Sequence, residues 1–136
     1  MSVDVVRAYN EAWAAGDIGA ARHMIADDLQ FHGPMDTFTN ADDMASALTG
    51  LAQVTAGIRW HALFAHTDGD GTNDRDGTND RDGTVNVAAF YCLDTAVGPL
   101  ECAEWHVVRG GLIRRIELRF DPRPLLSAAE DSPDQR

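Results

Sequence analysis

A short stretch near the end of the chain carries side chains that can move protons. Glu104 and His106 alternate with apolar residues in a segment with the pattern of a β-strand, where alternate side chains share one face. Tyr91 occupies the expected strand before it, and a hairpin centred on Val97–Gly98 would place Tyr91 opposite Glu104. The same register would place Ala89 opposite His106. A carboxyl, an imidazole and a phenol on one face are groups that general acid–base catalysis uses.

Glu104 is the most informative of these residues because the rest of its face is mainly apolar. A buried glutamate is rare unless it is paired or functional. In one interpretation, Glu104 and its polar neighbours lie at the open end of the fold, in water or hydrogen-bonded to each other. In the other, burial disfavours the carboxylate, and Glu104 serves as a neutral acid or hydrogen-bond donor. The pattern alone leaves both interpretations open.

The first half of the chain predicts the elements that position these strands. Apolar residues at helical spacing, and one alternating segment, predict three helices and a short strand over residues 3–15, 18–25, 29–32 and 41–51. Gly16 ends the first helix, and Asp17 and Asn40 are suited to cap the other two. Met24 and Ile25 are expected on the apolar face of the second helix.

The second half changes to the two-residue period of strands, expected over residues 58–66, 85–95, 100–108 and 112–120. Gly110–Gly111 is suited to a hairpin turn. Helices followed by a meander of strands predict an α+β fold, in which helices cover one face of a curved antiparallel sheet. The other face carries Phe90, Trp105 and Val107, and this apolar surface predicts a homodimer.

An internal repeat separates the first two long strands, since the hexad Asp70–Arg75 recurs immediately afterwards. The simplest interpretation is an expanded, flexible hairpin loop over residues 68–84. Calcium binding is the alternative, because its Asp-Arg-Asp-Gly stretches imitate part of an EF-hand loop, although the acidic first ligand and the final Glu are missing. We expect one domain over residues 1–126 with this loop, followed by a polar tail over 127–136.

Composition excludes several functional classes. The chain has 136 residues and a net charge of −11, which argues against nucleic-acid binding. No stretch is long and apolar enough to span a membrane, and the first residues lack a secretion signal, so we expect a cytoplasmic protein. Cys92 and Cys102 are expected to be buried thiols. No histidine or cysteine spacing indicates a metal, and we assign none.

Three segments together resemble the SnoaL-like branch of the nuclear transport factor 2-like superfamily: Tyr9–Asp17, Ala26–Pro34 and Gly111–Pro124. The resemblance spans about residues 3–125 apart from the repeat. It implies a cone-shaped, curved antiparallel sheet wrapped around the N-terminal helices, the cystatin-like α+β barrel, with a small-molecule pocket inside. The superfamily includes polyketide cyclases, ketosteroid isomerases, epoxide hydrolases, dehydratases and non-catalytic members, so the fold does not settle the function.

Ketosteroid isomerases hold a dienolate oxygen with a tyrosine of the first helix and an acid of a late strand, and an aspartate after the short strand moves the proton. The tyrosine position matches Tyr9. The acid position matches Glu104 if one residue of the Gly110–Gly111 turn is omitted. The base position matches Gly33, which cannot move a proton, and the adjacent His32 is the nearest substitute.

Two other chemistries of the superfamily lack their residues here. The water-activating positions of limonene epoxide hydrolases fall on Tyr91, Leu93 and Leu118. The last-strand aspartate of SnoaL-like polyketide cyclases also falls on Leu118. Neither mechanism can operate in its known form with these side chains.

We therefore predict a cofactor-free enzyme that isomerises, cyclises or dehydrates a hydrophobic carbonyl compound, such as a polyketide or isoprenoid intermediate. His32 would be the base, and Tyr9 and Glu104 would donate to the enolate oxygen. His106 would be a supporting acid or an orienting residue. The walls of the substrate pocket would be Trp13, Tyr91, Ile116, Leu118 and Phe120. The alternative is a non-catalytic module that binds such a ligand or mediates assembly.

Overall fold

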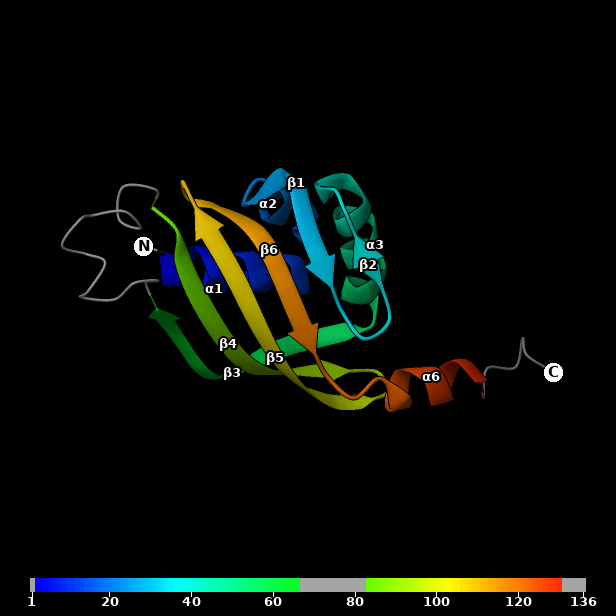
Figure 1. Cartoon of the computed structure of the whole chain (residues 1–136). Coiled ribbons are helices and arrows are strands. Elements are labelled where there is room, and N and C mark those ends of the chain that lie inside the picture. Colours follow the sequence, from blue (N-terminus) through cyan, green and yellow to red (C-terminus); the bar gives the residue numbers. More distant parts are fainter. Residues whose placement is uncertain (1, 67–82, 131–136) are drawn as a thin grey trace.

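The computed structural model describes residues 2–66 and 83–130, with only the backbone of 127–130. Its helices are α1 (Ser2–Ala14), α2 (Ile18–Arg22), α3 (Ala41–Gln53) and α6 (Arg123–Glu130). Its strands are β1 (Ile25–His32), β2 (Thr37–Phe38), β3 (Thr55–His66), β4 (Val85–Thr95), β5 (Gly98–Arg109) and β6 (Leu112–Arg119). The α+β class predicted from the sequence is confirmed (Figure 1).

The helix caps are those that the sequence predicts. The side chain of Asp17 accepts a hydrogen bond from the Ala20 N–H at 3.1 Å, and that of Asn40 accepts one from the Asp43 N–H at 2.8 Å. The predicted extension of α2 through Met24 and Ile25 is wrong. The Met24 carbonyl accepts the N–H of Ile113 at 2.9 Å, so pairing with β6 already starts the strand there.

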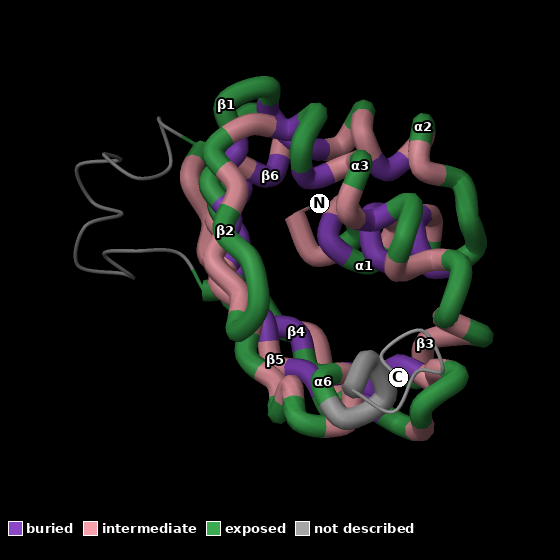
Figure 2. Tube along the Cα trace, turned by 90° about the vertical axis from the view of Figure 1, so that its right-hand side faces the viewer, coloured by how far each residue is buried: buried purple, intermediate pink, exposed green. Residues whose placement is uncertain are grey.

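The strands form one sheet in the order β2-β1-β6-β5-β4-β3, which is curved and does not close into a barrel. Neighbouring strands are antiparallel except β1 and β6, which pair in parallel and are joined by the long connection that parallel strands require. Figure 2 shows the sheet bending around α1, α2 and α3. The concave face and these helices enclose the core, in which Val6, Leu29 and Ile116 are fully buried.

The register of the β4–β5 hairpin differs from the predicted one. Tyr91 lies opposite Cys102, and Ala89 lies opposite Glu104. The predicted turn centre was wrong because Thr95 and Gly98 pair directly and leave a two-residue turn. A shift of two residues keeps every side chain on its predicted face, since the period of a strand is two.

Two regions fall outside these predictions. The helix α6 was not predicted, and it extends into the expected tail as far as Glu130. The repeat up to residue 82 and residues 131–136 lie outside the described residues, so the flexible loop and the calcium alternative stay predictions. Within the described residues, no helix has the length and apolarity to cross a membrane.

Candidate active site

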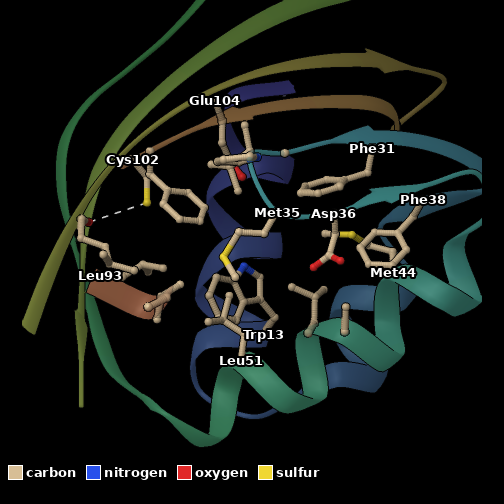
Figure 3. A pocket seen from close by; sticks show the side chains of 18 of the residues that line it. Trp13, Phe31, Met35, Asp36, Phe38, Met44, Leu51, Leu93, Cys102 and Glu104 are labelled. Carbon is tan, nitrogen blue, oxygen red and sulfur yellow. Dashed lines mark hydrogen bonds between the residues drawn. The ribbon is translucent and has the colours of Figure 1, made fainter. Parts of the chain in front are cut away.

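A cavity of about 360 Å³ lies between the concave face of the sheet and the helices α1 and α3. Its walls are mainly aromatic and aliphatic side chains, including Trp13 of α1 and Leu51 of α3 (Figure 3). Two carboxyl groups also line it, Glu104 from β5 and Asp36 from the loop between β1 and β2. An apolar cavity with a few polar groups is the usual form of a small-molecule site.

Glu104 is buried, with 7% of its surface exposed, and its hydrogen bonds with Asn10 and His106 end on the same oxygen, while Tyr91 also hydrogen-bonds to this carboxyl group. Oε1 accepts from Nδ2 of Asn10 at 3.2 Å and lies 2.7 Å from Nε2 of His106. Both partners are fully buried. Glu104 is thus hydrogen-bonded to His106 and also lines the cavity, so both interpretations of this residue stay open.

The phenols beside Glu104 are held neutral. Burial raises the pKa of Tyr9 well above its usual value, and the nearby charge of Glu104 raises it further. Burial is also the largest cause that raises the pKa of Tyr91, followed by the charges of Glu104 and Cys102 and by a hydrogen bond with Glu104. Burial and then Glu104 also raise the pKa of the Cys102 thiol to about 12. These groups can therefore donate hydrogen bonds at neutral pH, and the thiol is a poor nucleophile.

Most of the predicted pocket residues do line the cavity. They are Tyr9, Trp13, Tyr91, Glu104, Leu118 and Phe120. His106 and Ile116 are fully buried and lie opposite each other on β5 and β6, but they do not line the cavity.

His32 does not reach the cavity. Phe31 points inward from β1, so its neighbour His32 points to the convex face, where Nδ1 lies 3.0 Å from Oε2 of Glu117. The expectation that His32 is the base is therefore not supported by its position, because strand alternation places adjacent residues on opposite faces.

The sequence reasoning missed two residues. The sequence pattern predicts no role for Asn10, although a fully buried amide in a helix signals a hydrogen-bond partner inside the fold. Asp36 has no predicted role because it lies three positions after the expected base position at Gly33, with Pro34 and Met35 between them. The turn in which Gly33 N–H donates to the Asp36 carbonyl, at 2.9 Å, brings Asp36 to the cavity.

Gly33 itself is constrained by packing. A Cβ at this position would lie 2.9 Å from the ring of Phe31, closer than such atoms normally approach. A side chain there would force Phe31 to move. An acidic residue at the position where ketosteroid isomerases carry their base therefore does not fit this loop as it stands.

No group of three or more His, Cys, Asp or Glu residues within the described ranges could hold a metal ion. The chemistry that the site offers comes from two carboxyls and two neutral phenols around an apolar space. Such a set can donate hydrogen bonds to an oxygen and exchange protons with a carbon next to it.

Residues 6–116 match the family model of the SnoaL-like domain. The chain belongs to the SnoaL-like domain family. No curated protein matches it in sequence.

Solved structures with the same fold are distant in sequence. A protein of unknown function from Cytophaga hutchinsonii, described as NTF2-like, is 16% identical with a TM-score of 0.69, covering 93% of this chain and 95% of that one. A steroid delta-isomerase from Pseudomonas aeruginosa is 16% identical with a TM-score of 0.66, covering 95% and 86%. A candidate polyketide cyclase from Xanthomonas campestris is 15% identical with a TM-score of 0.63, covering 93% and 94%. At this identity the likeness shows the fold.

Proposed function

We propose that the protein is an enzyme that moves a proton on a hydrophobic carbonyl compound, such as a polyketide or isoprenoid intermediate, using side chains alone. One observation carries the proposal. Tyr9 and Glu104 line an apolar cavity whose other carboxyl group, Asp36, comes from the loop between β1 and β2. Isomerase and cyclase names among the structural neighbours support the same class of reaction.

The mechanism assigns Asp36 the role that the sequence pattern gave to His32. The Asp36 carboxylate removes a proton from the carbon next to the carbonyl group, and the electron pair moves onto the carbonyl oxygen. Tyr9 and Glu104 donate hydrogen bonds to that oxygen as its charge develops. Asp36 then returns the proton to a second carbon, which completes an isomerisation, or a carbon–carbon bond forms instead in a cyclisation.

The charge of the cavity narrows the substrate class. Among the described residues that line it, Asp36 and Glu104 are the acidic ones, and none is Lys, Arg or His. A carboxylate or phosphate on the ligand would enter without a counter-ion, which is unfavourable in an apolar site. The substrate of this proposal is therefore uncharged.

Ligand binding without turnover is the second candidate function. The observation that favours it is the constrained Gly33, because the residue that moves the proton in ketosteroid isomerases has no equivalent there. In that case the cavity would sequester the same kind of hydrophobic carbonyl compound.

Exchange of the acidic protons of 2-tetralone into D₂O, followed by NMR, separates these functions. The enzyme should accelerate exchange, and Asp36→Asn should slow it by a factor on the order of 10² to 10⁴. Asp28→Asn, an exposed position on β1, is the matched control and should exchange at the wild-type rate. Binding of 2-tetralone with exchange no faster than in buffer would contradict the enzyme and favour the binding module.

Binding of 2-naphthol, whose phenol oxygen stands in for the enolate oxygen, tests the two donors. Tyr9→Phe and Glu104→Ala should each weaken binding by about 1 to 3 kcal/mol. Glu104→Gln keeps a donor and should lose less. Glu101→Gln, an exposed position on the same strand, should have no effect. Equal affinity in all of these variants would remove Tyr9 and Glu104 from the mechanism.

A further inference from the structure

The side chain of Asn10 can face Glu104 in only one way. The indole N–H of Trp13 can only donate, and it points at Oδ1 of Asn10 at 3.0 Å. The other end of the amide must then be the NH₂ group. Its two hydrogens point to the Val6 carbonyl and to Oε1 of Glu104, each at 3.2 Å. Trp13 thereby fixes Asn10 as a donor to Glu104.

His106 has a single hydrogen-bond partner among the described residues, because Nε2 lies 2.7 Å from Oε1 of Glu104 while Nδ1 is buried without one. The Tyr9 ring packs edge-on against the imidazole, with the centroids 6.1 Å apart. An Nδ1–H, in the other tautomer or in the imidazolium, would be a buried donor without an acceptor. A bare lone pair on Nδ1 is the less costly arrangement.

We propose that Asn10 and His106 are positioning residues that reserve Oε1 of Glu104 for their own N–H groups, so that Oε2 is the oxygen presented to the ligand. In this arrangement His106 is a neutral imidazole with its hydrogen on Nε2. It acts through Glu104 and does not itself exchange protons with the substrate. This deepens the proposed function, on which the role of Oε2 rests.

The arrangement is compatible with Glu104 as an acid, because Oε1 then accepts both N–H groups as a carbonyl oxygen and Oε2–H points to the cavity. It also explains why glutamine should be tolerated at this position. Its carbonyl oxygen can replace Oε1, and its NH₂ group can replace the Oε2 hydroxyl as a donor. The ionisable groups around Glu104 and His106 are Tyr9 from α1, Tyr91 from β4 and Cys102 from β5.

Nitrogen NMR of ¹⁵N-histidine-labelled protein tests the tautomer without any ligand. His106 should show one protonated and one bare nitrogen, with the proton on Nε2. Its signal is assigned as the one that survives replacement of the other histidines by Gln, all of which are more exposed. A proton on Nδ1, or on both nitrogens, would overturn the inference whatever the protein binds.

Affinity for 2-naphthol tests the positioning role. His106→Met and Asn10→Leu should each raise the Kd about two- to tenfold by freeing Oε1. His106→Gln places an amide N–H near Nε2 and should restore much of the affinity. Wild-type affinity in both His106→Met and Asn10→Leu would overturn the positioning role. Failure of the wild-type protein to bind 2-naphthol would instead count against the proposed function, and the tautomer would still be decided by NMR.

Discussion

The two faces of the sheet each carry a glutamate, and the electrostatic surroundings of these two glutamates differ. On the concave face, the hydrogen-bond partners of Glu104 are the amide of Asn10, the imidazole of His106 and the phenol of Tyr91. On the convex face, Glu117 of the neighbouring strand contacts the cations Arg115 at 2.7 Å and Arg119 at 3.5 Å. Among the described residues, Glu104 therefore accepts hydrogen bonds but has no arginine beside it, whereas the charge of Glu117 is balanced by two arginines.

The electrostatic consequence is clearest at Glu117. Partial burial opposes its ionisation, but the hydrogen bonds and charges of Arg115 and His32 outweigh it and lower the pKa of Glu117 below its usual value. A carboxyl group locked in its charged form stabilises a fold but is a poor proton donor. The convex face is therefore suited to charge pairing, whereas the concave face holds its carboxyl group with hydrogen bonds from Asn10 and His106.

The apolar content of the faces differs as well. Buried aromatic residues of the concave side line the cavity, whereas Phe64, Phe90 and Trp105 lie on the convex side with 54%, 39% and 48% of their surface exposed. Phe64 and Phe90 pack edge-to-face with their ring centroids 5.8 Å apart. We propose that a second copy of the chain covers this patch, as the sequence pattern predicts.

Asn10→Asp should produce the largest effect, because it replaces the N–H donor to Glu104 with a carboxylate oxygen inside the core. We expect a loss on the order of 3 kcal/mol in the free energy of unfolding at pH 8, measured with urea. Asn40→Asp is the matched control. It should be nearly neutral, since aspartate also caps a helix. Similar stability of both variants would mean that the concave face tolerates charge, and the contrast between the faces would fail.

Trp105→Glu should have the next largest effect, on association and not on folding. A charge at the centre of the proposed interface would be buried without a partner, so the dimer dissociation constant should rise at least about tenfold. Light scattering at micromolar concentration measures this. Val97→Glu, also an exposed apolar residue but in the β4–β5 turn, should stay dimeric. A monomeric wild-type protein would contradict the proposed use of the convex face.

Glu117→Gln should have the smallest effect. Since the folded-state pKa of Glu117 is lowered, its contribution to stability is present above about pH 4.5 and is lost as the pH falls through the folded value. The wild type should thus lose more stability than Glu117→Gln between pH 5 and 3, by less than about 1 kcal/mol. Glu101→Gln, whose pairing with His61 is exposed to water, is the control. Parallel pH profiles for wild type and Glu117→Gln would mean that the ion pairs of Glu117 do not contribute to stability.

Much of the fold could be predicted because local patterns specify it. The caps at Asp17 and Asn40 and the bounds of β4 were correct, since they depend on side chains next to each other in sequence. The parallel pairing of β1 with β6 and the helix α6 were not predicted. The pairing depends on segments that are distant in sequence, and the helix has only a weak local signal.

Within the site, strand alternation alone placed Tyr91, Glu104 and His106 on the concave face, because a period of two survives an error of two residues in register. Tertiary structure decided the rest. It turned His32 to the convex side, brought Asp36 to the cavity through the turn at Gly33, and joined Asn10 to a glutamate 94 residues away. Sequence periodicity determines which way a side chain points from its own element, but only packing of distant elements decides what it meets.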